Sequence, residues 1–237
     1  MLSEADFQTM LKFKNLSEVQ YDLAVSPLND TSLKKLYTFV KQQNWFKLHK
    51  KIFSIPRIYT PKSLEAALHF HVKFYMDFVS SLTTKYPMIS FDSTCINSIE
   101  KNITAQFMEL AQKTLVWDVR SKLENISKNT LNETEAFNYY LTHRFGTNTI
   151  EYFFLEYPTL TRLLSERLMY AMDNLEIIIN SIKTSKKELS TTFGIKPPFS
   201  INNLQSKKGD SHNKGKTTTI LEINHVLLVY KLSLIHI

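Results

Sequence analysis

Two consecutive prolines, Pro197 and Pro198, divide the sequence into two parts with different hydrophobic patterns. Before this pair, apolar residues recur at the three- and four-residue spacing that is typical of amphipathic helices. After it, apolar and β-branched residues gather in short runs that are typical of strands. A helix cannot continue through the pair, because proline has no backbone N–H and its ring clashes with the preceding turn. The sequence therefore predicts an α+β protein, with a mostly helical region over residues 1–195 and the start of a β-sheet over residues 196–237.

The region before the prolines contains several long apolar stripes. They predict helices over residues 31–48, 63–85, 93–127 and 132–145, and a further helix that begins after Pro158 and is closed by Phe193-Gly194. The expected first residues have side chains that can accept hydrogen bonds from free N–H groups of the first turn: Asp30 or Thr31, Ser63, Ser93 and Thr159. Gly146 is expected to stop the fourth helix in a left-handed conformation.

The region after the prolines predicts three strands, over residues 199–204, 217–223 and 226–230. Asn224 and His225 fit the two-residue turn of a hairpin between the last two strands. The polar segment between the first two strands contains Gly209 and Gly215 and is expected to form a loop. Three strands cannot bury both faces of a sheet alone, so we expect them to begin a larger β lobe.

The composition limits the classes of protein to which this chain can belong. It contains four glycines, which favours long helices, and one cysteine, which excludes a disulfide framework or a thiol-rich zinc site within the chain. We interpret this residue, Cys95, as a small packing residue. The first residues lack the basic and apolar segments of a signal peptide, and no apolar run approaches the ~18 residues that cross a bilayer. The expected location is the cytoplasm, without a membrane span.

The net charge of +7 is compatible with acidic or phosphate-bearing partners. Most lysines, however, are spread singly among glutamates and aspartates, as on an ordinary solvated surface. A nucleic-acid reader should concentrate Lys and Arg on one helix face, and no helix in this sequence does so. We therefore expect no nucleic-acid partner.

The segment from Lys207 to Lys216 carries the residues best suited to chemistry on a phosphate. Gly209 and Gly215 allow a backbone to approach a phosphate closely. Asp210 and His212 form a possible acid/base pair, because histidine titrates near neutrality and a carboxylate can orient it. Lys231 ends the third strand, the place at which protein kinases carry the lysine that contacts nucleotide phosphates. A solvated turn and an ordinary strand-end lysine are the alternative interpretation of these residues.

Two blocks of the sequence resemble a known family. Gly209-Asp-Ser-His-Asn-Lys-Gly215, followed by an apolar strand and by Val229-Tyr-Lys231, resembles a signature of the class II (LanM-type) lanthipeptide synthetases, Gly-Asp-x-His-x-x-Gly…Val-Tyr-Lys. Upstream, Tyr157-Pro-Thr-Leu-Thr-Arg-Leu-Leu164 resembles that family's Tyr-Pro-x-Leu-x-Arg-Leu-Leu segment. The signature belongs to the dehydration domain of these enzymes, and the resemblance extends over about residues 135–231.

The resemblance implies a lipid-kinase-like domain with helical additions that takes part in lantibiotic biosynthesis. Such a domain uses ATP and Mg²⁺ to phosphorylate Ser and Thr of a ribosomal precursor peptide, and then eliminates the phosphate to leave dehydroamino acids. By the same resemblance, Lys231 would contact the ATP phosphates, with Gly209 and Gly215 beside them, and Asp210 and His212 would serve the elimination. Zinc would belong only to a separate cyclase domain.

The sequence also departs from the family. Family members continue Tyr-Lys-Pro-Arg, whereas Leu232 follows Lys231 here. The Mg²⁺ ligands of a kinase-like site would lie in a further lobe, so we expect a truncated chain that is inactive alone and contributes no metal ligand. Two other hypotheses remain: a non-catalytic helical scaffold over residues 1–195 that binds the precursor peptide, and a nucleic-acid-binding protein, for which charge and aromatic residues are the only support.

Overall fold

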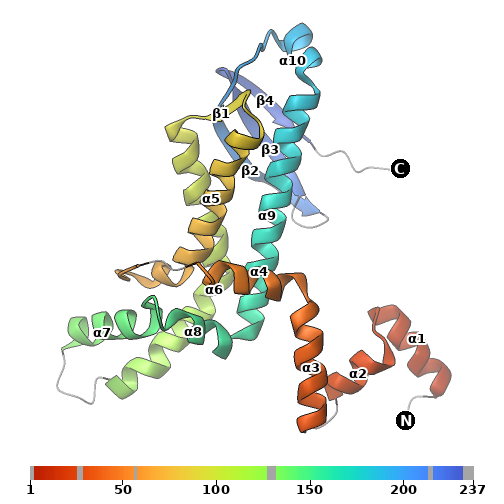
Figure 1. The fold of residues 1–237 in the computed structure, drawn as a ribbon, viewed down its shortest axis with the longest axis vertical. Helices are drawn as coiled ribbons and strands as arrows, with labels where there is room; N and C mark the ends of the chain where they lie inside the picture. Colours follow the sequence, from red (N-terminus) through yellow and green to blue (C-terminus); the bar gives the residue numbers. More distant parts are fainter. Residues whose placement is uncertain (1–2, 26–28, 56–57, 127–131, 213–215, 232–237) are drawn as a thin grey trace. The chain divides into compact units, whose positions relative to one another are not determined.

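The computed structural model describes residues 3–25, 29–55, 58–126, 132–212 and 216–231. The chain divides into two compact units, Met1–Leu48 and His49–Ile237. The first unit contains helices α1 (Glu4–Lys14), α2 (Glu18–Val25) and α3 (Asp30–Gln42), and α4 (Asn44–Phe53) crosses the boundary between the units (Figure 1). The sequence analysis placed a boundary between a helical region and a β lobe at residue 195, which is not the boundary between these two units. That predicted boundary stays a prediction.

The helix that we predicted over residues 31–48 is two helices. Gln43 adopts an extended backbone conformation between α3 and α4 and thereby ends the first of them. The cap of α3 is Asn29 and not Asp30 or Thr31: the Asn29 side chain accepts from the Ser32 N–H at 2.9 Å, and the Ser32 hydroxyl accepts from the Asn29 N–H at 2.8 Å. This reciprocal pair satisfies two backbone donors, which a single cap residue cannot do.

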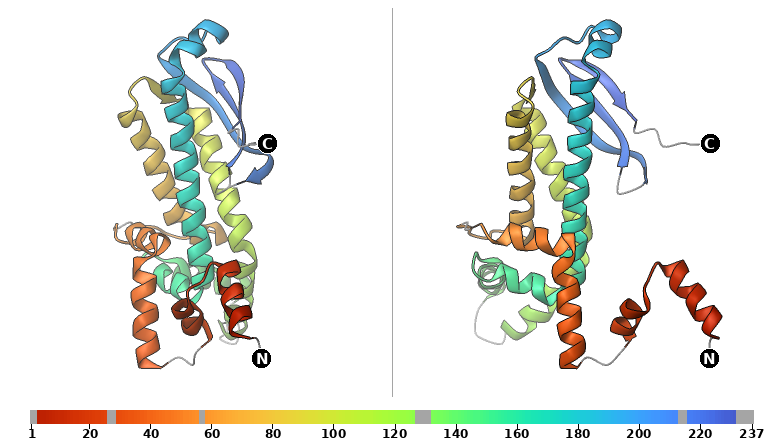
Figure 2. Two further views of the ribbon diagram at one scale, coloured as in Figure 1. Left: turned by 90° about the vertical axis from the view of Figure 1, so that its right-hand side faces the viewer. Right: turned by 45° about the vertical axis from the view of Figure 1, so that its right-hand side comes forward.

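The second unit combines a helical bundle with a small sheet. Its elements, in chain order after α4, are the 3₁₀ helix η1 (Leu64–Leu68), α5 (His69–Lys85), β1 (Ile89–Phe91), α6 (Ser93–Ile126), α7 (Glu133–Phe145), α8 (Ile150–Glu156), α9 (Pro158–Thr184), α10 (Lys186–Phe193), β2 (Phe199–His212), β3 (Lys216–Ile223) and β4 (Val226–Tyr230). Helices α5, α6 and α9 pack against one another, and α6 also packs against β2 (Figures 1 and 2). The predicted α+β class is confirmed.

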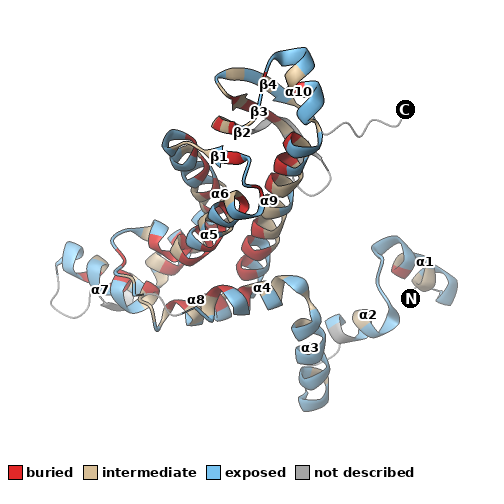
Figure 3. Cartoon of the chain, turned by 45° about the horizontal axis from the view of Figure 1, so that its top comes forward, coloured by how far each residue is buried: buried red, intermediate tan, exposed pale blue. Residues whose placement is uncertain are grey.

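The apolar stripes of the sequence line the core of this unit. Buried residues recur along α6 at Ile99, Ile103, Phe107 and Leu115, and the stripe of α9 is buried from Leu160 to Ile182. Figure 3 shows this burial concentrated on the facing sides of the bundle helices and on the sheet, whereas α1 to α3 are mostly exposed. The hydrophobic periodicity therefore identified most buried positions of α5, α6 and α9, although Ile96 of the α6 stripe is exposed and α3 has no buried residue.

Several helix boundaries differ from the prediction. Ser63 makes no capping hydrogen bond, and the first turn after it is 3₁₀. Helix α6 begins at Ser93 as expected. Helix α9 begins at Pro158 itself, so Thr159 lies inside the first turn; proline suits this position because its missing N–H would have no partner there. The single helix that we predicted as far as Gly194 is two helices: α9 ends at Thr184, and Ser185 separates it from α10, which Gly194 closes in the left-handed conformation with φ +69°.

Gly146 ends α7, but not in the predicted way. Its φ of −62° is open to any residue, so the prediction of a left-handed stop was wrong. A Cβ added at Gly146 would lie 2.6 Å from the carbonyl oxygen of Thr142, which is closer than two such atoms can approach. The position requires glycine because of this close backbone contact.

The sheet has the strand order β1-β2-β3-β4. The predicted β3–β4 hairpin is present, and its turn residues Asn224 and His225 have the positive φ values, 49° and 64°, of such turns. Two features were not predicted. Strand β1, between α5 and α6, pairs in parallel with β2, and β2 continues through the segment that we predicted as a loop, as far as His212. No helix within the described ranges has the length and apolar composition of a membrane-crossing segment.

Candidate functional site

The predicted loop that carries Gly209, Asp210 and His212 is the last part of strand β2. Lys208 pairs with Thr218, and His212 pairs with Lys216, with register irregularities before each pair. The loop prediction was wrong because the β3 backbone supplies partners for this segment, which overrides its polar, Gly-containing sequence. The side chains of residues 206–212 lie outside the described part of the chain, as does the whole of Gly215.

The antiparallel register brings Lys231 to the same part of the sheet. Tyr230 is the last paired residue of β4, and its partner on β3 is Thr219. Lys231 follows directly, level with Thr218, the partner of Lys208. The backbone of Lys231 is therefore about two strand spacings, or ~10 Å, from that of Lys208. His212 pairs with Lys216, two residues from Thr218 along β3, so it lies only ~7 Å further along the hairpin.

The two faces of β4 differ. Val226, Leu228 and Tyr230 are half-buried, whereas Leu227 and Val229 are 65% and 62% exposed. Since side chains alternate along a strand, the outward face is the one to which Lys231 belongs, and Lys231 is exposed. This solvent-accessible face of the sheet is the one available to a ligand of Lys231.

The β3–β4 turn is fixed to the beginning of β2. The Asn224 amide donates to the carbonyl oxygens of Lys196 (2.8 Å) and Pro198 (3.1 Å), and its oxygen accepts from the Ser200 N–H at 2.7 Å. The His225 N–H donates to Asn202 at 3.0 Å. These bonds hold the backbone of the turn, from which β4 runs to Lys231.

Asn202 connects the sheet to the start of α6. Its amide donates to Asp92 at 2.9 Å, and Asp92 also accepts from the Thr94 hydroxyl and the Cys95 N–H, both at 2.7 Å. Hydrogen bonds from Thr94, from the Cys95 N–H and from Asn202 lower the pKa of Asp92 to about 2. Burial raises the pKa of Cys95 to about 12, so the thiol stays protonated, in agreement with its interpretation as a packing residue.

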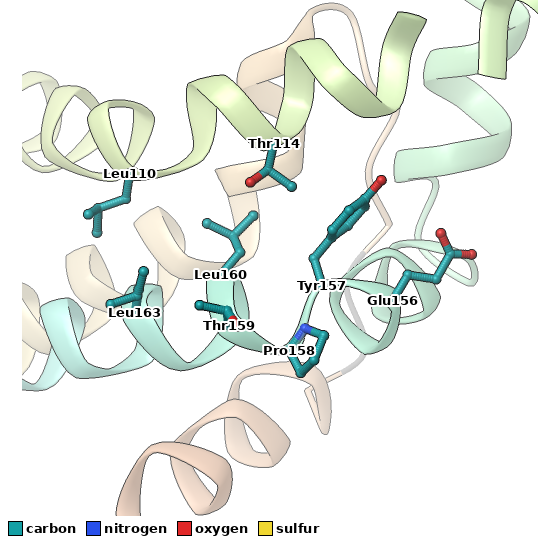
Figure 4. Close-up of a pocket in the computed structure, with 8 residues that line it drawn as sticks. All are labelled: Leu110, Thr114, Glu156, Tyr157, Pro158, Thr159, Leu160 and Leu163. Carbon is teal, nitrogen blue, oxygen red and sulfur yellow. The ribbon is translucent and has the colours of Figure 1, made fainter. Parts of the chain in front are cut away.

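A second candidate site is a groove of about 290 Å³ between α6 and the start of α9, with a lining of mixed polarity that includes Thr114, Glu156 and Thr159. Figure 4 shows Leu110 and Thr114 of α6 facing Leu160 and Leu163 of α9, with Tyr157 and Pro158 at one end. Residues 157–163 belong to the upstream block that carries the family resemblance. The groove therefore lies on that block, and not on the β-hairpin.

Tyr157 is held in the groove wall by a buried carboxylate. Asp118 is fully buried and accepts from the hydroxyls of Tyr140 (2.7 Å) and Tyr157 (2.8 Å). The Arg144 guanidinium donates to both oxygens of Asp118, at 2.9 and 2.7 Å, and also pairs with Glu156. Arg144 further lies over the Phe153 ring, 5.0 Å from its centroid. A buried charge of this kind is tolerated because it is fully hydrogen-bonded.

The Asp118 cluster has shifted acidities. Burial alone would raise the pKa of Asp118, but hydrogen bonds from Arg144 and the two tyrosines outweigh it and lower the pKa below its usual value. Burial and the hydrogen bond to Asp118 raise the pKa of Tyr157 to about 12. Asp118 is therefore ionised and Tyr157 is protonated at neutral pH. Our sequence analysis missed this cluster, although an aspartate three residues after Leu115, on the buried stripe of α6, was a usable signal.

His49 and His71 are buried among the described residues of the second unit. His71 packs against Phe53, Phe107 and Phe154, with ring centroids 5.0–6.1 Å apart. His69 is half-buried and stacks on the Tyr59 ring, with the centroids 3.8 Å apart. In the described ranges, no group of three or more His, Cys, Asp or Glu residues is arranged to hold a metal ion.

Comparison with known proteins gives a family match over the C-terminal third of the chain. No curated protein matched the sequence. The matched family model is described as a domain of unknown function (DUF4135), and the match covers residues 157–231. The match thus begins at Tyr157, which lines the groove between α6 and α9, and ends at Lys231. Over these residues the chain is similar to a domain that is found in lanthipeptide synthetase-like proteins.

Proposed function

We propose that this chain contributes the phosphate-handling sheet of a lanthipeptide dehydratase, which phosphorylates Ser and Thr of a precursor peptide with ATP and then eliminates the phosphate. In this proposal Lys231 contacts the nucleotide phosphates, with Gly209 and Gly215 nearby, and Asp210 and His212 serve the elimination. The observation that supports it is the register of the sheet. Lys231 is level with the Lys208–Thr218 pair, and the Asp210–His212 segment continues from that pair along the same hairpin.

The elimination step requires a base and a stabilised leaving group. The base removes the Cα proton of the phosphorylated residue, the C–H electrons form the Cα=Cβ bond, and the Cβ–O bond breaks so that phosphate leaves with its electron pair. A neutral histidine oriented by a carboxylate is suited to accept the proton near pH 7. Lysine ammonium groups stabilise the negative charge that develops on the phosphate.

The proposed cofactors are ATP and Mg²⁺. An exposed lysine at the end of a strand, as Lys231 is, fits a contact with nucleotide phosphates. When bound, Mg²⁺ would neutralise charge on the phosphates. Since the described residues hold no group of three ligands, we assign no Mg²⁺ ligand and no step of the reaction to the metal in this chain. The proposed partner is a precursor peptide, the proposed location is the cytoplasm, and zinc is proposed only for a separate cyclase domain.

The proposal can be tested with an acyl-phosphate derivative of ATP, which acylates lysines that lie beside bound phosphates. We expect Lys231 to be acylated faster than the chain's other lysines, and excess ATP to suppress this reaction selectively. Lys113, an exposed lysine of α6, is a control within the same sample. Equal labelling of Lys231 and Lys113, without protection by ATP, would contradict the proposal.

A second candidate function is peptide binding without chemistry, which the groove between α6 and α9 favours. The groove presents leucines, Tyr157 and Pro158 beside the polar side chains of Thr114, Glu156 and Thr159, so it could accept both apolar and polar groups of a peptide. This function predicts saturable binding of the precursor peptide that is weakened by Leu163→Asp and unchanged by Lys231→Met. The dehydratase proposal requires Lys231 for ATP-dependent labelling, so the two experiments separate the functions.

A further inference from the structure

The end of strand β4 is fixed by a side chain that the sequence patterns did not indicate. Backbone pairing of β4 stops at Tyr230, so the sheet ladder does not hold the backbone of Lys231. The Tyr230 hydroxyl lies 3.0 Å from the hydroxyl of Ser181 on α9. This contact joins the residue before Lys231 to a helix that is distant in the sequence.

The direction of this hydrogen bond follows from the other bond of Ser181. Its hydroxyl donates to the carbonyl oxygen of Ile177 at 2.8 Å. A serine hydroxyl has a single proton, so while this bond is made it is the acceptor in its contact with Tyr230, and the tyrosine is the donor. Ser181 is therefore oriented by the backbone of its own helix before it receives the Tyr230 proton.

The support behind Ser181 is rigid. Its neighbours on α9, Ile178 and Ile182, are 3% and 5% exposed and belong to the core of the bundle. Tyr230 is on the inward face of β4, and Lys231, one residue later, belongs to the outward face. Fixing the Tyr230 ring thus fixes the point from which the Lys231 side chain leaves the sheet.

We propose that Ser181 is a positioning residue for Lys231: by accepting the Tyr230 hydroxyl proton, it holds the end of β4 so that the Lys231 ammonium is presented to phosphate on the outward face of the sheet. The inference rests on the proposed function, because it assumes that Lys231 meets a nucleotide phosphate. It gives α9 a second role beyond the bundle core, since the same helix lines the groove against α6 at its beginning and fixes the lysine near its end.

The test compares labelling of Lys231 by the acyl-phosphate derivative of ATP in four variants of the full chain. Ser181→Ala removes the acceptor, Tyr230→Phe removes the donor, and the double variant removes both. We expect each to lower the ATP-protected labelling of Lys231 about fivefold, the factor that corresponds to one neutral hydrogen bond. Labelling in the double variant should be no lower than in either single variant, because the two substitutions remove the same hydrogen bond. Ser181→Thr keeps the hydroxyl and should restore labelling.

The controls distinguish positioning from loss of fold and from failure of the proposed function. Labelling of Lys113 and the thermal unfolding transition should be nearly the same in all variants, which a general structural role of Ser181 would not produce. If Lys231 is labelled with ATP protection in the wild type and equally in Ser181→Ala, the positioning role is overturned and the proposed function stands. If the wild type shows no ATP-protected labelling of Lys231, the proposed function fails, and the positioning role fails with it.

Discussion

Among single side chains, the buried polar residues contribute much of the stability of the second unit. Asp118 is the clearest case, since its carboxylate is removed from water and depends on Arg144, Tyr140 and Tyr157 for compensation. Burying a charge is unfavourable, and removing one partner leaves the others buried without their hydrogen bonds. Each residue of this cluster is therefore expected to contribute more to the free energy of unfolding than its few hydrogen bonds suggest.

We expect Asp118→Ala to lower the free energy of unfolding by about 3–5 kcal/mol, because it leaves the Arg144 charge and two tyrosine hydroxyls without their acceptor. The matched control is Asp77→Ala, since Asp77 pairs with Lys73 at 2.9 Å on the surface. An exposed pair of this kind contributes about 1 kcal/mol or less. Both values can be measured by urea denaturation, and equal losses in the two variants would refute a special role for the Asp118 cluster.

The two buried histidines should make the stability depend on pH. Burial lowers the pKa of His49 to about 4, with nearby Glu151 opposing and Lys50 adding to the shift; burial and the nearby His49 lower the pKa of His71 to about 3. Both pKa values are below that of an unfolded histidine, so the unfolded state binds more protons in this range. The two histidines make their full contribution to stability above about pH 6.5, and this contribution is lost as the pH falls toward their pKa values in the folded protein.

At about pH 5 the free energy of unfolding should be lower by about 2 kcal/mol for each of these histidines, because proton binding is linked to unfolding. We therefore expect His71→Leu to flatten the decrease in stability between about pH 6.5 and 4, in urea titrations at several pH values. Leu82→Val, at a buried residue of the same helix that has no titratable group, is the control and should leave the slope unchanged. An identical slope in His71→Leu and the wild type would show that His71 is not buried in its neutral form.

Among the secondary-structure elements, two helix ends show that glycine can be required for two different reasons. Gly194 is required for its positive φ, and space for a side chain is available there. Gly146 has an ordinary φ, but the Thr142 carbonyl occupies the place of a Cβ. The sequence reports only that a glycine follows a helix in both cases, and the backbone packing decides which property is used.

Substitutions at the two glycines should differ accordingly. Gly194→Ala should cost about 1–2 kcal/mol, and Gly194→Asn clearly less, because asparagine tolerates the left-handed conformation. At Gly146, alanine and asparagine should destabilise the protein alike, by about 1–3 kcal/mol, since any Cβ meets the carbonyl. Thermal unfolding of the four variants checks this, and rescue by asparagine at Gly146 would contradict the contact with Thr142.

In the molecule as a whole, buried apolar residues are distributed unequally along the chain. Of the described core residues, only Leu11 belongs to the unit Met1–Leu48, which exposes Phe13, Val19 and Tyr37 by more than half. The remaining core residues belong to His49–Ile237. Apolar burial is the main favourable term in folding, so the second unit has the greater capacity to fold independently.

We expect a chain that begins at Gln43, which keeps α4 intact, to retain a cooperative thermal transition close to that of the full chain. Tolerance of a truncation depends on the burial of the removed residues, and nearly all of those before Gln43 are exposed or half-buried. The complementary peptide, residues 1–42, should show no cooperative transition by circular dichroism. Loss of the transition in the longer piece would mean that the first unit contributes to the core of the second.

The sequence by itself determined the class of the fold, most buried positions of α5, α6 and α9, and the hairpin turn at Asn224-His225, because these depend on local periodicity and on backbone preferences of single residues. It also supplied the motifs around Asp210, His212 and Lys231, whose roles stay a prediction. Only the tertiary structure decided that β2 continues through the expected loop, that β1 joins the sheet, and that Asp118 and Ser181 find partners on other elements. These features depend on groups far apart in the chain, so local sequence patterns do not encode them.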